Sequence, residues 1–416
     1  MATTNPASAV DAPRVDPATR TMLSIALGAF LASMAMNFWV PLLPLYMQEL
    51  GAGGDAASLF WSAFASVSLG VGRIVSGPAW GIVSDRFGRK LMFVRALFFA
   101  SATIAIVGAA QAPWHVAIAF MVQGLFSGFI PAATALMSVS VPEQRLGRGL
   151  SLLTGGQYLG TTIGPALGAA LVLVLGFRGT ILAGAVLPMS AAAVVWFLVP
   201  RDAVRARRSS EASSTEVPVE RPLWRVLPGQ FYIAVAVFFL LFAMTDVLRL
   251  LTPLALRQIA GAERAAGLAG TAFSLSGLAA VVGVLVIAQR WVRVGRLRVT
   301  LWVGALCAAA GAAMLAVTSH VPAYIALFAA VSLVQATLVP ATNTLIATHV
   351  PRDRRGAGFG LVSSVQALAM MAGPIVAAAA GGISLALGFV ATGTVFALAA
   401  VLVLVVVREP EVATER

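Results

Sequence analysis

Long apolar segments separated by short polar turns run through almost the whole chain. A helix that crosses a lipid bilayer needs about 20 mainly apolar residues, and runs of that kind occur twelve times. The pattern therefore predicts an all-α membrane protein with twelve transmembrane helices. Their approximate limits are 22–48, 57–84, 91–111, 115–139, 149–176, 180–200, 230–256, 265–289, 299–318, 322–348, 357–384 and 388–407.

One polar segment interrupts this pattern near the middle of the chain. Residues 201–229 are rich in Ser, Arg and Glu, a composition typical of a flexible linker. The linker separates two predicted six-helix bundles, 22–200 and 230–408, which are flanked by polar tails at 1–21 and 409–416. The first apolar run is too long for a cleaved signal peptide, so we expect it to remain as a membrane span.

The two predicted bundles are similar in sequence. An offset of 209 residues aligns the segment that begins at Val141 with the one that begins at Val350, and it pairs Asn37 with Asp246. Parallel repeats related by an axis along the membrane normal are typical of transporters that bind their substrate near the midplane. Further matched positions are Pro44/Pro253, Pro131/Pro340, Gln157/Gln366, Gly164/Gly373 and Pro165/Pro374.

Charged residues are scarce and unevenly placed. They make up 11% of the chain, against about 25% in a soluble domain, and the mean hydropathy is +0.92. If both termini are cytoplasmic, the only lysine and all but five arginines lie in cytoplasmic segments. This bias predicts the orientation, and it explains the net charge of +12 without a nucleic-acid partner. The exceptions are Arg73 and Arg249 within spans and Arg178, Arg257 and Arg264 on the outer side.

Residues that support enzyme chemistry or metal binding are few. Cys307 is the only cysteine, and His115, His320 and His349 lie far apart in the sequence, so we expect neither a disulfide nor a metal site. An ATP-binding loop needs Ser or Thr after its lysine, but the only lysine is followed by Leu91. We therefore expect no enzyme, no ATP-driven pump and no cofactor.

A dense charge cluster separates the second and third predicted spans, where residues 81–90 read GIVSDRFGRK. Its glycines allow a tight turn and close helix approach. Its acid can favour a helix N-terminus, and its basic side chains can bind helix C-terminal carbonyls or carboxylates. Positive-inside orientation alone would explain the basic residues but not the acid, which Val292 replaces in the second half. The cluster comprises Gly81, Asp85, Arg86, Gly88, Arg89 and Lys90.

Small residues dominate one face of the fifth predicted span, where residues 160–169 read GTTIGPALGA. Glycines at every fourth position share a helix face and permit close packing, while a proline removes a backbone donor and bends the helix. The pattern predicts a flexible, tightly sealed seam between the halves, with ordinary small-residue helix packing as the alternative. The residues are Gly160, Gly164, Pro165 and Gly168, with Gly373 and Pro374 at repeated positions.

Together these motifs resemble those of the major facilitator superfamily, over essentially the whole chain. GIVSDRFGRK fits the family's turn motif G-x-x-x-D-R-x-G-R-K at every fixed position. GTTIGPALGA resembles the fifth-span motif of the family's drug antiporters, with Ala169 in place of the last glycine, and NFWVPLLPLYMQELGA at 37–52 resembles the first span of bacterial multidrug exporters. Many such exporters carry a fourth-span arginine shortly before a Gln-Gly pair; here Gln123-Gly124 is present, but Phe120 stands at the arginine position.

The resemblance implies a secondary active transporter that exports lipophilic or amphipathic compounds by alternating access. In the family the turn at 81–90 holds the halves together when the pocket faces outward, and the fourth-span arginine, which Phe120 replaces here, is linked to proton coupling. The resemblance to drug antiporters makes proton antiport the expected energy source. The expected partners are the lipid bilayer, a lipophilic small molecule and protons, and we expect a monomer in the cytoplasmic membrane.

Ionisable side chains within the predicted spans are candidates for coupling. Asp246 and Arg249 share one face of the seventh span, about 15 Å from its outer end. A charge near the middle of the bilayer is costly and usually functional. Asp246 is the only carboxylate within a predicted span, so we expect it to bind the proton, with a structural Asp246–Arg249 pair as the alternative. Arg73 would line the pocket, bind a helix end or take part in coupling.

Neutral polar and aromatic residues in the spans predict a large, mainly apolar cavity of the kind that accepts varied lipophilic substrates. Each residue alone could instead join two helices, and only the group indicates a pocket. The members are Asn37, Phe38, Trp39, Gln123, Phe126, Gln157, Tyr158, Gln335, Asn343, Gln366 and Met370.

Two other functions are compatible with the same fold: a lipid flippase, and a facilitator of a small solute such as a sugar. Transport that follows an imposed pH gradient would separate them from a proton antiporter. A purely structural or receptor role would not require the repeated Gly-Pro pairs or the charged turn.

Overall fold

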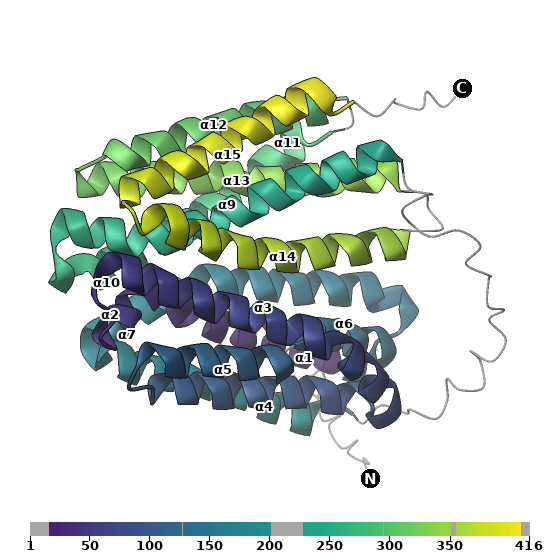
Figure 1. The fold of residues 1–416 in the computed structure, drawn as a ribbon. Coiled ribbons are helices and arrows are strands. Elements are labelled where there is room, and N and C mark those ends of the chain that lie inside the picture. Colours follow the sequence, from purple (N-terminus) through teal and green to yellow (C-terminus); the bar gives the residue numbers. More distant parts are fainter. Residues whose placement is uncertain (1–15, 127, 201–227, 294, 351–354, 409–416) are drawn as a thin grey trace, which may run out of the picture.

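The computed structural model describes residues 16–126, 128–200, 228–293, 295–350 and 355–408, and these residues form helices joined by short turns (Figure 1). Residues 1–15 of the predicted N-terminal tail, most of the predicted linker and the predicted C-terminal tail lie outside these ranges. The first helix begins at Pro17, earlier than the expected start at residue 22, because proline fits the first helical position, where its missing N–H is not needed.

The first half contains the helices of residues 17–198. They are α1 (Pro17–Trp39), η1 (Val40–Leu42), α2 (Leu43–Glu49), α3 (Gly54–Phe87), α4 (Arg89–Gly108), α5 (Pro113–Phe126), α6 (Phe129–Ser140) and α7 (Glu143–Leu198).

The second half contains the helices of residues 229–406. They are α9 (Gly229–Ala260), α10 (Ala262–Val282), η3 (Gly283–Ala288), α11 (Gln289–Trp291), α12 (Leu297–Val317), α13 (Val321–His349), α14 (Arg355–Gly381) and α15 (Leu385–Val406).

Eleven helical stretches of the described chain are long and apolar enough to cross a membrane. The difference from the expected twelve arises in α7, whose 56 residues join the predicted spans 149–176 and 180–200. Gly176, with φ 68° and ψ 179°, interrupts the helical backbone at that boundary. Glycine adopts such positive φ values readily because it has no Cβ.

The helices of the two halves lie on opposite sides of the molecule, with α3 of the first half beside α14 of the second (Figure 1). Two buried apolar clusters lie in the first half, around Trp39 and around Phe93, and a larger cluster around Phe389 fills the second half and includes a few residues of the first. Large apolar side chains also face outward, including Val174 and Phe197, which are 80% and 79% exposed. An apolar exterior of this kind is expected of a protein that faces lipid.

Glycine contacts reproduce the sequence repeat in three dimensions. A Cβ added to Gly164 would lie 3.3 Å from Cβ of Asn37, and one added to Gly373 would lie 3.0 Å from Cβ of Asp246. The offset of 209 residues relates both members of the two pairs. Thus α7 packs on α1 in the first half as α14 packs on α9 in the second.

The glycines of the fifth-span motif do not form the seam expected between the halves. A Cβ on Gly160, Gly164 or Gly168 would lie 2.6, 2.8 or 1.6 Å from a backbone oxygen of α1, which belongs to the same half. The face of α7 toward α10 carries Thr162 and Ala169 instead. The glycine face of the motif therefore packs on α1 of its own half. Glycine has no side chain, so the two helix backbones can approach this closely.

We expect Gly168→Ala to destabilise the protein by about 1–3 kcal/mol, the usual cost of overpacking, because its Cβ would meet the Phe38 carbonyl oxygen. The matched control is Gly155→Ala in the same helix, where a Cβ meets nothing within 4 Å. Thermal unfolding of both variants in detergent measures the difference. Equal midpoints for the two variants would contradict the assigned packing.

Candidate functional site

A polar contact joins the two halves in the middle of the helices. Nη2 of Arg249, on α9, donates a hydrogen bond to Oδ1 of Asn37, on α1, over 3.0 Å. Nδ2 of Asn37 donates in turn to the carbonyl oxygen of Ser33 over 2.8 Å, which holds the amide in place. Asn37 and Arg249 are therefore a link between α1 and α9.

The same guanidinium lies near the only acidic side chain predicted within the spans. Nη1 of Arg249 is 3.9 Å from Oδ1 of Asp246, one turn earlier on α9, and the Asp246 side chain is only 19% exposed. Oδ2 of Asp246 is buried, and the described residues offer it no hydrogen-bond partner. The structure thus brings together the predicted residues Asn37, Asp246 and Arg249, and it leaves one carboxylate oxygen unsatisfied.

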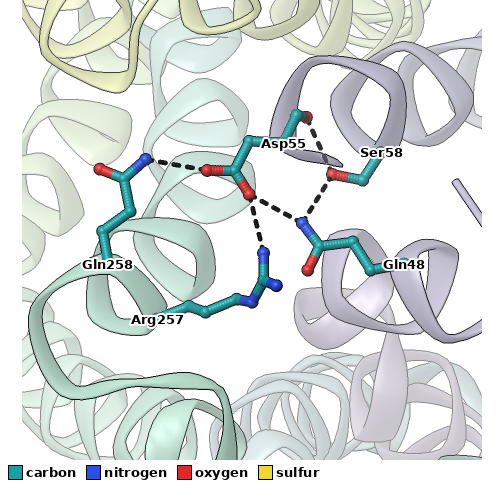
Figure 2. A network of polar contacts seen from close by, with 5 residues as sticks. All are labelled: Gln48, Asp55, Ser58, Arg257 and Gln258. Carbon is teal, nitrogen blue, oxygen red and sulfur yellow. Dashed lines mark hydrogen bonds and ion pairs between the residues drawn. The ribbon is translucent and has the colours of Figure 1, made fainter. Parts of the chain in front are cut away.

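A second link between the halves lies at one end of the helices, opposite the ends at which the described chain starts and finishes. We call the end near Asp16 and Arg408 the terminal end and the opposite one the distal end. At the distal end Asp55 accepts hydrogen bonds at Oδ1 from Nη1 of Arg257, over 3.1 Å, and from Nε2 of Gln48, over 2.8 Å. Nε2 of Gln258 donates to Oδ2 over 2.8 Å (Figure 2).

Helix ends position the members of this distal network. Asp55 lies in the first turn of α3, and Arg257 in the last turn of α9, where the helix dipoles favour an acid and a base respectively. Gly54, with φ +90°, allows the chain to enter α3. The ion pair is partly exposed, at 24% for Asp55 and 37% for Arg257, so the pair alone contributes about 0–1 kcal/mol.

Polar contacts described at the terminal end join helices of the same half. Asp16, which precedes α1, forms an ion pair with Arg145 at the start of α7, and this hydrogen bond lowers the pKa of the Asp16 carboxyl below its usual value. Nζ of Lys90 donates to the carbonyl oxygens of Trp196 and Val199 over 2.7 and 2.5 Å. These last two contacts confirm that Lys90 binds a helix C-terminus.

The remaining residues of the charged turn are described only in part. Gly88 has a positive φ of 95° directly before α4, so it makes the tight turn that was predicted. Gly81, Asp85 and Arg86 belong to α3, but their side chains lie outside the described part of the structure. The predicted latch role of Asp85 therefore stays a prediction.

A narrow gap lies within the first half, and the space in it that a water molecule can reach is about 10 Å³. Gln123 lines it, and Nε2 of this residue lies 2.8 Å from Sδ of Met36, whereas its Oε1 is buried without a partner among the described residues. The full lining consists of Met36, Arg73, Ala96, Ala100, Gln123, Phe126 and Phe129.

A gap with the same water-accessible space, about 10 Å³, lies within the second half. The offset of 209 residues converts Met36, Phe126 and Phe129 of the first gap into three of its lining residues, so the two gaps are related by the repeat. Nε2 of Gln335 is buried there without a described partner. The lining consists of Phe238, Leu241, Phe242, Thr245, Gln335, Leu338, Val339 and Thr342.

Other predicted pocket residues lie elsewhere. Phe38 and Trp39 are 3% and 2% exposed and belong to the first-half core, where Trp39 packs edge-on against Phe120 with centroids 5.7 Å apart. They therefore support the helices rather than face a cavity. Gln157, Asn343 and Gln366 are half-buried, Met370 is exposed, and the side chain of Tyr158 lies outside the described part.

The sequence did not predict the distal network. Arg257 was visible as an exception to the positive-inside bias, which is the one signal that could have drawn attention to it. Asp55 and Gln48 carried no such signal, because an acid in the first turn of a helix and an amide in the last turn of another are common. Only the packing of α9 beside α3 brings Arg257 within 3.1 Å of Asp55.

Comparisons with known proteins agree with this architecture. The family model described as Major Facilitator Superfamily matches residues 25–291 and 253–416. A relative named multidrug resistance protein MdtG, from Yersinia enterocolitica serotype O:8 / biotype 1B, is 27% identical over 386 residues, which are 92% of this chain and 91% of the relative.

Solved structures share the fold. A bacterial homologue of the human lysosomal transporter Spinster superimposes with a TM-score of 0.72 at 12% identity, over 95% of this chain and 98% of the other. The D-xylose-proton symporter does so with a TM-score of 0.69 at 17% identity, over 94% and 98%. With family model, relatives and fold in agreement, the chain belongs to the Major Facilitator Superfamily of membrane transporters.

Proposed function

We propose that this transporter exports lipophilic or amphipathic small molecules in exchange for protons. The match to a multidrug resistance protein along nearly its full length supports multidrug export. The observation that carries the coupling proposal is the contact of Arg249 with Asp246 of its own half and Asn37 of the other. This arrangement connects an acidic group to the interface between the halves.

The proposal includes twelve membrane crossings, with α7 crossing twice. Its arms 143–175 and 177–198 would extend about 50 and 33 Å at 1.5 Å per residue, each enough for a hydrocarbon core of about 30 Å. The terminal end is placed in the cytoplasm because the arginine bias favours that side. The distal network then lies at the outer surface.

Alternating access requires the two halves to separate at one end and then at the other. In our proposal the distal network of Asp55, Arg257 and Gln258 closes the outer end while the pocket is open to the cytoplasm. The charged turn at 81–90 closes the cytoplasmic end while the pocket is open to the outside. These two contacts act as latches made of individually weak interactions, so that substrate and proton binding can shift the balance between the two states.

Proton binding at Asp246 would act on the central link. An ionised Asp246 attracts Arg249, whereas a protonated one does not. Loss of this attraction leaves Arg249 free to change its contact with Asn37 of the other half. In this way the protonation state of Asp246 changes the contact between Arg249 and Asn37, which joins the two moving halves.

Asp246→Asn is expected to abolish the dependence of transport on a pH gradient, because the amide does not take up a proton at neutral pH. Uptake of a lipophilic fluorescent dye into proteoliposomes, with and without the gradient, measures this directly. Glu263→Gln is the matched control, since it neutralises an exposed carboxylate in the first turn of α10. Gradient-driven transport that survives in the Asp246 variant would exclude this residue as the coupling group.

Loss of the distal ion pair is expected to favour opening of the outer end by about 1 kcal/mol or less, the range of an exposed pair. The variants are Asp55→Asn and Arg257→Gln. A cysteine at Leu59, a buried position beside Gly381 of α14, reports the opening through reaction with an impermeant maleimide once Cys307 is replaced by serine.

Two controls sharpen this experiment. Arg264→Gln removes an exposed arginine near the start of α10 and should not change the labelling rate. The charge swap Asp55→Arg with Arg257→Asp should restore the slow rate. Equal labelling in wild type and both single variants would show that the network does not hold this end closed.

A further inference from the structure

We propose that the gap of the first half binds the acidic group of an amphipathic molecule, with Arg73 as the anion-binding side chain and Gln123 as a second polar contact. The inference rests on the proposed export function and names the class of substrate. The ligand is defined by its chemistry, a carboxylate or sulfonate on an apolar body. The acidic head group of a lipid has the same chemistry.

Arg73 is held at this gap by close backbone packing. A Cβ on the preceding Gly72 would lie 2.9 Å from Cα of Gly124 on α5, and a Cβ on Gly124 would lie 3.1 Å from the backbone nitrogen of Arg73. These contacts fix the start of the Arg73 side chain beside Gln123, and both residues line the gap. Its position follows from the packing of α3 on α5 rather than from a flexible loop.

No hydrogen bond or ion pair engages the Arg73 guanidinium within the described part of the chain. A cation inside a membrane protein is costly unless it is paired. The rest of the lining comes from four helices: Met36 from α1, Ala96 and Ala100 from α4, Gln123 and Phe126 from α5, and Phe129 from α6. None of these carries a negative charge, so a counter-ion for Arg73 has to come from outside this set.

Other charged groups of the interior have different surroundings. The guanidinium of Arg95 stacks on the Trp80 ring, with 3.4 Å from Cζ to the ring centroid. Arg249 contacts Asp246 and Asn37. Arg73, by contrast, lines a gap in which a further hydrogen bond can form, because Oε1 of Gln123 is buried there without a described partner.

The chemistry of the two polar groups defines the ligand. A guanidinium donates two parallel hydrogen bonds to the oxygens of a carboxylate or sulfonate. The free Oε1 of Gln123 accepts a hydrogen bond from a neighbouring hydroxyl or N–H of the same molecule. The gap related by the repeat has no charged residue in its lining, so the preference for an anion belongs to the first half only.

The size of the gap limits what enters it. The space that a water molecule can reach inside it is about 10 Å³, against about 300–1,000 Å³ for the site of a whole drug-sized ligand. In our proposal only the oxygen atoms of the acidic group enter this space, and the apolar body of the ligand lies outside it among the helices.

The test compares binding of 1-pyrenebutyrate and its uncharged primary amide to the full-length protein in phosphatidylcholine nanodiscs at neutral pH. Wild type should bind the carboxylate more tightly than the amide. Arg73→Gln should reduce this preference about tenfold, the loss of about 1.4 kcal/mol, and Arg73→Lys should retain part of it. Arg95→Gln is the matched control, which removes a cation that stacks on Trp80, and it should keep the wild-type preference.

Each of three results would overturn the proposal: the wild type binds the carboxylate no more tightly than the amide, the Arg73→Gln variant keeps the wild-type preference, or this variant loses the same affinity for both ligands. If Arg73→Gln does not elute as a monodisperse protein, Arg73→Met, which also lacks the charge, takes its place. Competition by added phosphatidylglycerol that depends on Arg73 would support the acidic-group site and assign it to a lipid. Absence of competition assigns it to a free amphipath.

Binding is measured without a gradient and without transport. A protein that shows the Arg73-dependent preference but does not move dye in proteoliposomes would reject the export function and retain the anion site. The opposite result, export without this preference, would reject only the site.

Discussion

Backbone contact between helices without intervening side chains is the constraint on which the structure depends. Lipid provides no hydrophobic driving force for helices to associate, so their association depends on close packing of small residues. Gly164 lies against α1 and Gly373 against α9, with Asn37 and Asp246 directly at the two contacts. Because backbone separation is so short there, the polar residues of α1 and α9 occupy defined positions in the middle of the molecule.

Few charged side chains lie between the helices of the described chain, and those that join the two halves differ in their contacts. Arg249 joins the halves through Asn37 while it lies near Asp246. Asp55 joins them again at the distal end, through Arg257 and Gln258. Oδ2 of Asp246 is buried without a described partner, so a change of charge on this carboxyl group is costly, whereas the partly exposed distal pair is weak. In the proposed cycle this difference suits a sensor in the middle and a latch at the distal end.

The two halves of the repeat differ in their polar side chains. The two gaps share lining positions related by 209 residues, yet Arg73 lines only the first. Likewise Asn37 and Asp246 occupy matching positions, but only the latter can exchange a proton. Two halves with the same packing and different polar groups give a symmetric frame around a centre whose chemistry is asymmetric.

The sequence by itself determined the helical membrane architecture, the repeat and the candidates Asp246 and Arg249, because hydrophobic run length, charge bias and buried charge are local properties of the chain. It also predicted the binding of Lys90 to a helix end. Only the tertiary structure decided which glycine faces pack within a half, that Asn37 meets Arg249, and that Asp55 meets Arg257 across 202 positions of sequence. Such contacts depend on how whole helices rotate and approach, and no local pattern encodes the distance between two side chains on different helices.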